Sequence, residues 1–198
     1  MTIVLSGTTA IAAPNGTFRQ AHEYGYGDKS SLDPASRGRV MQITEKLMSR
    51  LIRPDMKGSP SPDLATSWSS NDEATVWTLN LREGVKFHDG SGFDSGDVIY
   101  TFSRVLDPEN KSPARSAIKM IEKMEAPDDM TVKFTLSTPF ADMPLQLMDY
   151  RLRIIPENSG DSIATSGIGT GPFKLVSYDA AGVTKLEANM DYWEGAPG

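Results

Sequence analysis

The chain has 198 residues, no cysteine, two histidines, 20 lysines and arginines against 26 aspartates and glutamates, and a formal net charge of −6. The length fits one domain of ordinary size or two small ones, and the lack of cysteine excludes disulfides, thiolate nucleophiles and cysteine-ligated zinc. The acidic balance argues against nucleic acid, which needs a basic surface, and no apolar run approaches the roughly 20 residues that span a bilayer.

Residues 1–13 are small or apolar and carry no charge, and Pro14 and Gly16 follow closely. This pattern resembles the apolar core and the small-residue cleavage site of a secretory signal, although no basic residue precedes it. We therefore expect residues 1–13 to be the remnant of a signal peptide. A loose N-terminus or an edge strand is the alternative. A lipid anchor is not expected, because Thr8 stands where a lipidated cysteine would be.

The next segments predict a strand over residues 17–24 and a helix over about residues 37–52. The apolar residues of the helix recur at helical spacing; they are Val40, Ile43, Leu47 and Leu51. Arg53 and Pro54 should end the helix, since the residue before a proline disfavours helical geometry.

Residues 57–63 are rich in glycine, proline and serine and predict a loop, and residues 64–68 predict a short strand. Residues 75–82 alternate cleanly, with Trp77 and Leu79 on one side. This alternation is typical of a half-buried strand in an antiparallel sheet.

A second helix should begin at Asp94, with Asp97 completing a weak capping box. Val98, Phe102 and Val105 form its apolar stripe. The remaining pattern predicts a hairpin of residues 120–125 and 131–136, a helix over 139–150, a short strand over 152–155, and a second hairpin of 173–178 and 183–187. The class is therefore mixed α/β or α+β.

Sequence signals for catalysis are weak. Residues 167–172 read Gly-Ile-Gly-Thr-Gly-Pro, but the spacing differs from a dinucleotide loop and Pro172 opens a strand rather than a helix. His22 and His88 have no obvious nucleophile beside them, and His88 is expected to stabilise a turn. We expect no catalytic residue, no metal site and no cofactor.

Several motifs occur in a fixed order along the chain. Residues 62–68 read Pro-Asp-Leu-Ala-Thr-Ser-Trp, residues 76–90 include Leu-Arg-Glu-Gly-Val-Lys-Phe-His-Asp-Gly, and residues 189–197 include Asp-Tyr-Trp. Residues 32–34, 97–102 and 169–175 add three more. Together they resemble the extracytoplasmic solute-binding proteins of family 5, the peptide- and nickel-binding receptors of ABC importers.

The resemblance implies a mixed α/β, periplasmic binding protein-like class II fold. Members of this family are more than twice as long and have two lobes with the ligand between them. We therefore expect an N-terminal fragment: residues 14–54 and 166–198 form part of the core sheet of lobe I, residues 55–165 form its small sub-domain, and lobe II is absent.

The implied function is capture of di- or oligopeptides in the periplasm of a Gram-negative bacterium and delivery to a membrane permease driven by an ATPase. The expected partners are a small solute and those transporter subunits. We expect a monomer with no nucleic-acid partner that meets the membrane only through the permease. The alternatives are a family member specific for a nickel or metal chelate, a sugar or an opine, and an enzyme or self-contained binding domain on a related fold.

Five residues are predicted to touch ligand. In the family the loop after the first strand lines the cleft, which implies Tyr24 and Tyr26. An arginine near residues 149–156 points towards an anionic ligand group in some members, and strand alternation would place Arg151 and Arg153 on one face, able to hold a carboxylate. Arg115 is a weaker candidate. Packing of a tyrosine on the first helix and surface salt bridges of the arginines are the alternatives.

Overall fold

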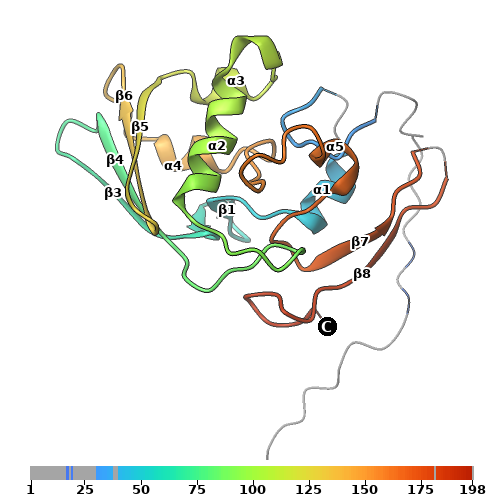
Figure 1. The fold of residues 1–198 in the computed structure, drawn as a ribbon. Helices are drawn as coiled ribbons and strands as arrows, with labels where there is room; N and C mark the ends of the chain where they lie inside the picture. The colour runs from blue at the N-terminus through green and yellow to red at the C-terminus, as the bar shows by residue number, and fades with distance from the viewer. Residues whose placement is uncertain (1–16, 18, 20–29, 38–39, 181, 198) are drawn as a thin grey trace, which may run out of the picture.

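The computed structural model describes residues 17, 19, 30–37, 40–180 and 182–197. Figure 1 shows helix α2 (Ser95–Leu106) with a twisted sheet on one side of it. On the other side lie helices α1 (Met41–Leu47) and α5 (Ile163–Ser166) and the hairpin of strands β7 (Phe173–Ser177) and β8 (Lys185–Ala188). The predicted signal remnant and nearly all of the strand predicted at 17–24 lie outside the described residues. The mixed α/β fold class is confirmed.

The sheet beside α2 has four antiparallel strands in the order β3-β4-β6-β5. The alternating pattern explains it, because Trp77 and Leu79 of β4 and Val132 and Phe134 of β6 are all buried on one face. The two predicted strands of the 120–136 hairpin and the strand at 75–82 are thereby confirmed. The bounds are β3 (Ala65–Ser70), β4 (Val76–Leu81), β5 (Ile121–Asp128) and β6 (Thr131–Leu136).

Helix α2 (Ser95–Leu106) covers the buried face of this sheet, and its predicted capping box is present. The Asp94 carboxylate accepts the Gly96 N–H at 2.7 Å, and the Asp97 carboxylate accepts the Asp94 N–H at 2.9 Å. Phe102 is fully buried and its ring stacks on Phe134 with centroids 5.0 Å apart. Burial of such a side chain contributes about 1.5–3 kcal/mol.

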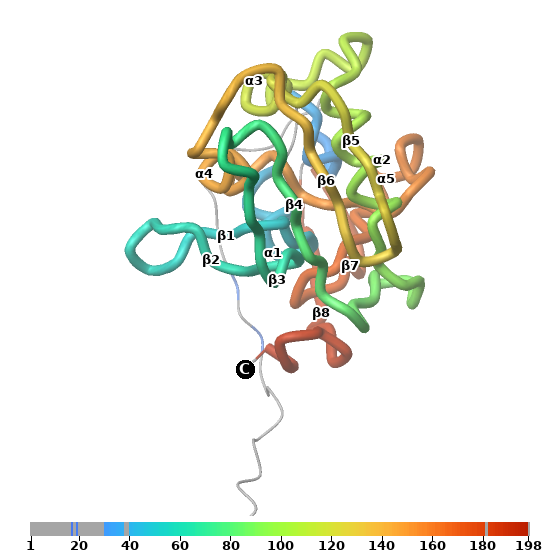
Figure 2. Tube along the Cα trace, turned by 90° about the vertical axis from the view of Figure 1, so that its left-hand side faces the viewer, coloured from blue at the N-terminus to red at the C-terminus, as the bar shows by residue number. Residues whose placement is uncertain are grey.

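The helix predicted over residues 37–52 is much shorter: α1 spans Met41–Leu47. Met48 is extended, and the carbonyls of Arg50 and Leu51 accept the N–H groups of Leu64 and Ala65 at 2.9 Å instead of closing helical turns. The chain then enters a small hairpin that projects from the sheet in Figure 2. Its strands are β1 (Ile52–Pro54) and β2 (Pro60–Pro62), so part of the predicted loop at 57–63 is a strand.

Two more predicted elements differ from the structure. The helix predicted over 139–150 is the single turn α4 (Met143–Leu147), and Leu145 on it is 46% exposed. Residues 152–155 form no strand beyond one bridge between Arg50 and Arg153. The reason is that the Ile155 N–H donates to the Thr101 hydroxyl rather than to a neighbouring strand.

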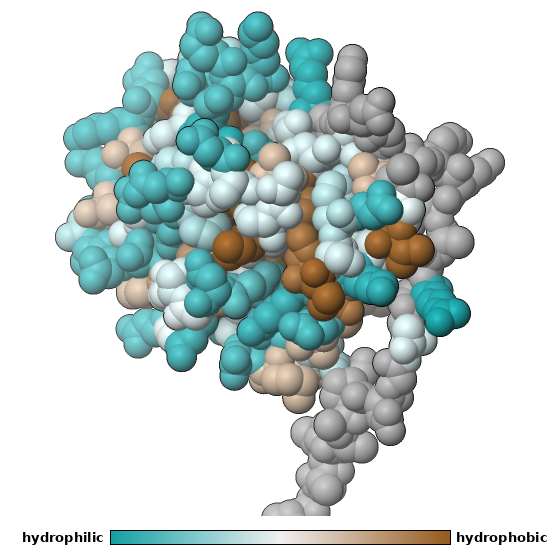
Figure 3. Space-filling model, turned by 45° about the vertical axis from the view of Figure 1, so that its right-hand side comes forward, coloured by the Kyte–Doolittle hydropathy of each residue, from teal (hydrophilic) through white to brown (hydrophobic). Residues whose placement is uncertain are grey.

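Short elements complete the described part of the chain: η1 (Pro108–Asn110), α3 (Arg115–Ile118), α5 (Ile163–Ser166), β7 (Phe173–Ser177) and β8 (Lys185–Ala188). The β7–β8 pair confirms the second predicted hairpin. Figure 3 shows apolar side chains among polar ones on the side that carries this hairpin. Val176, Val183 and Met190 there are 56%, 71% and 59% exposed.

The apolar core has two parts. The larger cluster fills the space between the four-stranded sheet and α2. A smaller cluster surrounds α1 and includes Leu32, Leu47 and Ile163. Among the described residues, no helix is long and apolar enough to cross a bilayer. The predicted division of lobe I at residues 55 and 165 stays a prediction.

Candidate functional site

A pocket of about 340 Å³ lies where seven segments of the chain meet. The C-terminal end of α1, the turn that follows it and strand β1 supply one side. Single residues from before β3, after α4, before β7 and after β8 supply the rest. The lining consists of Glu45, Lys46, Met48, Ser49, Arg50, Arg53, Asp63, Arg153, Pro172 and Tyr192. Four of these side chains are cationic and two are anionic, so the pocket favours a negatively charged ligand.

Arg153 is the most deeply buried of these cations, with 4% of its surface exposed. Its Nη1 donates to the Met48 carbonyl, while its Nε is buried without a hydrogen-bond partner. Burial, together with the nearby charge of Arg50, lowers the pKa of Arg153 to about 10. An arginine with that pKa is still charged near neutral pH, so the pocket holds a buried cation that a neutral carbonyl satisfies only in part.

Asp63 supplies the buried negative charge in this pocket. It is 5% exposed, and its Oδ2 accepts the main-chain N–H of Arg50 at 2.9 Å. Burial raises the pKa of Asp63, and the charges of Arg53, Arg50 and Arg153 oppose that rise. With Glu45 beside Lys46 and Glu194 beside Arg53, three carboxylates face the four cations of the lining, so one positive charge is left in excess.

Arg53 is held on the rim of the pocket by the segment after β8. Its guanidinium makes two hydrogen bonds with the Glu194 carboxylate, at 2.8 and 2.5 Å. The Tyr192 hydroxyl donates to Glu194 Oε2 at 3.3 Å. Burial is the main cause that raises the pKa of Tyr192, so its phenol stays neutral. This geometry places an aromatic ring with a polar end at the edge of the pocket, which suits a small polar ligand.

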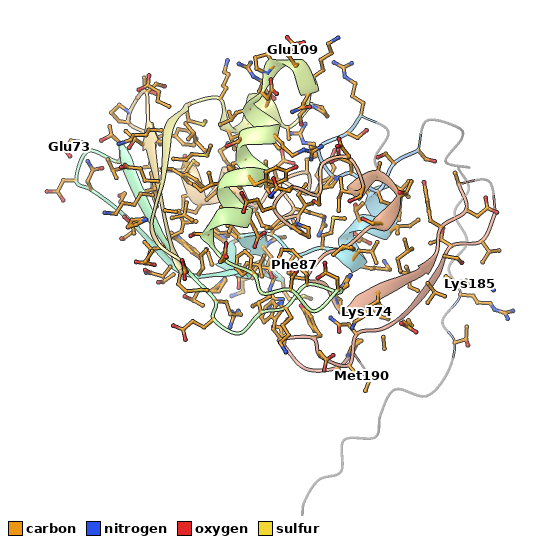
Figure 4. All side chains as sticks on the ribbon, viewed as in Figure 1. Glu73, Phe87, Glu109, Lys174, Lys185 and Met190 are labelled. Carbon is orange, nitrogen blue, oxygen red and sulfur yellow. The ribbon has the colours of Figure 1, made fainter. Side chains whose placement is uncertain are left out.

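A second, smaller hollow of about 270 Å³ lies beside the loop between β4 and α2. Phe87 of that loop and Lys174 of β7 both line it and lie near each other in Figure 4. His88, Asn189 and Asp191 also line it. Within the parts of the chain that the structure describes, no three histidine, aspartate or glutamate side chains converge on a metal-ion position.

The structure places the five predicted ligand residues in different surroundings. Tyr24 and Tyr26 lie outside the described residues. Arg153 lines the larger pocket, but Arg151 and Arg115 do not. Arg151 forms an ion pair with Asp149 and donates to the Pro113 carbonyl at 2.7 Å. The Nε of Arg115 donates to the Leu106 carbonyl at 2.9 Å.

The expectation that Arg151 and Arg153 share one face of a strand is wrong. Arg151 lies in a turn, where its N–H donates to the Asp149 carboxylate at 2.9 Å, whereas Arg153 forms an isolated β-bridge with Arg50. Alternation therefore does not apply across this pair. The two guanidiniums donate to carbonyls of different segments, at Pro113 and Met48.

Of the ten residues that line the larger pocket, the sequence predicts only Arg153. Among the nine others are Arg50, Arg53, Asp63 and Tyr192. Arg50 was expected inside a helix, and Arg53 was expected only to end it. Asp63 and Tyr192 stood within motifs that were recognised, so their positions carried a signal. Nothing in local spacing shows that residues 63 and 192 line one pocket, because tertiary structure brings them together.

The family model of bacterial extracellular solute-binding proteins, family 5 Middle, matches residues 59–198. This chain belongs to that family. The predicted resemblance is confirmed. The family is defined by the binding of solutes and not by a catalysed reaction.

Three relatives illustrate the similarity. The chain is 35% identical over 135 residues to the glutathione-binding protein GsiB of Pectobacterium atrosepticum, an alignment that covers 66% of this chain and 26% of the relative. A structure of AgaA from A. tumefaciens R10 in complex with agropinic acid superposes with a TM-score of 0.77 at 31% identity, covering 85% of this chain and 35% of that one. DppA from Helicobacter pylori in complex with the peptide STSA gives 0.74 at 30% identity, with 83% and 38% covered. The chain therefore spans about a quarter to two-fifths of the length of these proteins.

Proposed function

We propose that this chain is part of the substrate-binding component of an ABC importer that captures di- and oligopeptides outside the cytoplasm and delivers them to a membrane permease. The family membership supports capture of a solute. Two relatives, a glutathione-binding protein and a protein solved with the peptide STSA, favour peptides. The proposed setting is the periplasm of a Gram-negative bacterium, with a monomeric receptor, a permease and an ATPase as partners.

The observation that carries the proposal is the buried Arg153 at the pocket. Its Nε has no partner, and the lining carries more positive than negative charge. Because burying an unpaired charge is costly, a ligand carboxylate that neutralises Arg153 stabilises both partners. We propose that the C-terminal carboxylate of a peptide, or a carboxylate side chain, occupies this pocket.

Tyr24 and Tyr26 stay predicted ligand-contact residues. Arg115 and Arg151 also stay predictions. Each must exchange a present hydrogen bond, to the carbonyl of Leu106 or Pro113, for contact with ligand. In the proposed mechanism a second lobe closes over the ligand and removes water from these polar contacts.

The test is a nuclear magnetic resonance titration of the chain with the dipeptide Ala-Ala and, as the matched control, Ala-Ala amide, which lacks the carboxylate. We expect the signals of Arg153 and Tyr192 to shift with the dipeptide and not with the amide. A binding site formed by one lobe alone gives weak affinity, on the order of millimolar. Equal shifts with both compounds, or shifts confined to other parts of the chain, contradict the proposal.

An opine is the second candidate ligand, because AgaA was solved with agropinic acid and is 31% identical to this chain. The cationic pocket suits the acid group of either ligand. The same titration with agropinic acid distinguishes the two ligands. If the dipeptide shifts the Arg153 signals at a lower concentration than agropinic acid does, a peptide ligand is supported. The reverse order supports an opine.

A further inference from the structure

Residues 169–172, which we call the wall, lie between the larger pocket and His88, a residue that lines the smaller hollow. On one side Pro172 lines the larger pocket, and the Ser49 hydroxyl of that pocket donates to the Thr170 carbonyl at 3.5 Å. The wall is pressed onto the end of α1: a Cβ at Gly169 would lie 2.2 Å from the Leu47 carbonyl oxygen. A displacement of this wall therefore changes the shape of the larger pocket.

His88 holds the wall from the other side. Its main-chain N–H donates to the Gly169 carbonyl at 2.9 Å. Its ring Nδ1 accepts the Gly169 N–H at 3.3 Å, and its Nε2 lies 3.1 Å from the Gly171 carbonyl. An Nδ1 that accepts a hydrogen bond carries no proton, so the proton must be on Nε2, which donates to Gly171. The wall is thus bound by the neutral imidazole in one specific tautomer.

A proton on His88 disrupts this arrangement. An imidazolium donates from both nitrogens, so the Gly169 N–H loses its acceptor and meets a second N–H instead. Burial is the main cause that lowers the pKa of His88, and Lys174 on β7 adds to it. The Gly171 carbonyl and the neighbouring Asp89 oppose that change.

Other groups around the ring modify the balance without replacing the lost acceptor. Lys86 lies on the same loop and Asp191 follows β8, and both line the smaller hollow with His88. The Asn189 side-chain amide donates to the Gly171 carbonyl at 3.0 Å, and the Nε2–H of His88 still donates to it after protonation, so this carbonyl loses no donor. The Gly169 N–H is therefore the group in the wall that protonation affects most directly.

We propose that His88 is a positioning residue for the larger pocket: its neutral ring fixes the wall at 169–172, and acid removes the contact of the ring with the Gly169 N–H and so loosens the wall and the pocket. As a statement about solute capture, this inference rests on the proposed function. The coupling between His88 and the wall stands on the contacts described above. The chemistry required is a single proton transfer from solvent to Nδ1.

The experiment follows the chain by nuclear magnetic resonance without solute, from about pH 8 to about pH 5, across the usual range of imidazole titration. We expect the His88 ring to titrate with a midpoint below the ordinary value of about 6.5. The amides of Gly169, Thr170 and Ser49 should shift with the same midpoint. Hydrogen exchange of Gly169, corrected for its intrinsic pH dependence, should rise roughly fivefold on acidification, which corresponds to the loss of one net hydrogen bond.

Two variants separate titration from mere packing. The side-chain amide of His88→Asn places an acceptor near the position of Nδ1 without titrating, so the pH-dependent shift of Gly169 should disappear. The side-chain amide of His88→Gln reaches the position of Nε2 and leaves the Gly169 N–H without an acceptor. Fast hydrogen exchange of Gly169 should therefore persist at every pH. The proposal is overturned if the His88 ring titrates in the wild type while Gly169 and Ser49 do not respond, or if the Gly169 titration persists in His88→Asn.

Either variant could fail to fold, and in that case the wild-type titration decides alone. Every readout is taken without solute, so the two proposals can fail separately. If the wall residues titrate with His88 but the chain binds no dipeptide, the proposed function is wrong and the coupling stands. If the chain binds the dipeptide but the wall does not titrate with His88, the coupling alone is wrong.

Discussion

The close contact between the 169–172 segment and α1 predicts that Gly169→Ala is strongly destabilising. The new Cβ would lie 2.2 Å from the Leu47 carbonyl oxygen, 2.5 Å from Met48 Cγ and 2.9 Å from the Leu47 carbonyl carbon. Two of these three atoms belong to the main chain, so no rotamer change relieves the clash. Overpacking of this kind costs typically 1–3 kcal/mol.

A second cost arises because the Gly171 N–H donates to the same Leu47 carbonyl at 2.9 Å. If the segment moves away to make room, this bond is lost as well, at about 1 kcal/mol. We therefore expect Gly169→Ala to lower the free energy of unfolding by about 2–4 kcal/mol. Urea denaturation followed by tryptophan fluorescence and by circular dichroism measures this quantity.

The matched control is Gly92→Ala, because a Cβ at Gly92 would meet nothing within 4 Å and its φ is not in the left-handed region. An alanine there should leave stability unchanged or raise it slightly. The reasoning is refuted if the two variants differ by less than about 0.5 kcal/mol, the ordinary range for a neutral surface substitution.

Three further predictions concern the core, a buried acid and the pocket rim. Phe102→Ala should lower the free energy of unfolding in urea by about 3–5 kcal/mol, because removal of the stacked ring leaves a cavity. Leu145→Ala should lower it far less, because Leu145 is 46% exposed. Equal losses for the two variants contradict the assigned core. Burial raises the pKa of Asp97 to about 6. The stability that protonated Asp97 contributes is therefore full below the unfolded pKa of about 3.9 and is lost as the pH rises through about 6. A nuclear magnetic resonance titration in which the Asp97 carboxyl titrates near 3.9 contradicts this prediction. Glu194→Gln should change the free energy of unfolding by less than about 1 kcal/mol, since its pair with Arg53 is exposed, and a loss several times larger in thermal unfolding means that the pair is structural.

Local patterns predicted those elements whose stability is decided locally. Strand β4 alternates buried and exposed side chains, and α2 carries both its cap and its apolar stripe within one segment. The helix predicted over 37–52 failed because its last residues make hydrogen bonds with residues 64–65, a tertiary preference that overrides helical periodicity. The strand predicted over 152–155 failed for a similar reason, since the Thr101 hydroxyl takes the N–H of Ile155.

The site was less predictable than the fold. Arg153 was named because the resemblance placed an arginine near it, and the structure adds its burial and its unpartnered Nε. Asp63 and Tyr192 line one pocket although 129 positions separate them in the sequence, and no local rule predicts that they lie so near each other. Similarly, His88 was expected to stabilise its own turn, whereas its ring hydrogen-bonds to a wall more than 80 residues away.

The central claim is that the pocket around Arg153 receives an anionic group of a captured solute. The most direct measurement is the affinity of the chain for Ala-Ala near neutral pH, in the wild type, in Arg153→Gln and in the surface control Lys185→Gln. The account predicts weak binding on the order of millimolar for the wild type and the control. It also predicts no detectable binding for Arg153→Gln, because truncating one side of a buried charge pair costs about 2–5 kcal/mol. Unchanged affinity in Arg153→Gln would contradict it.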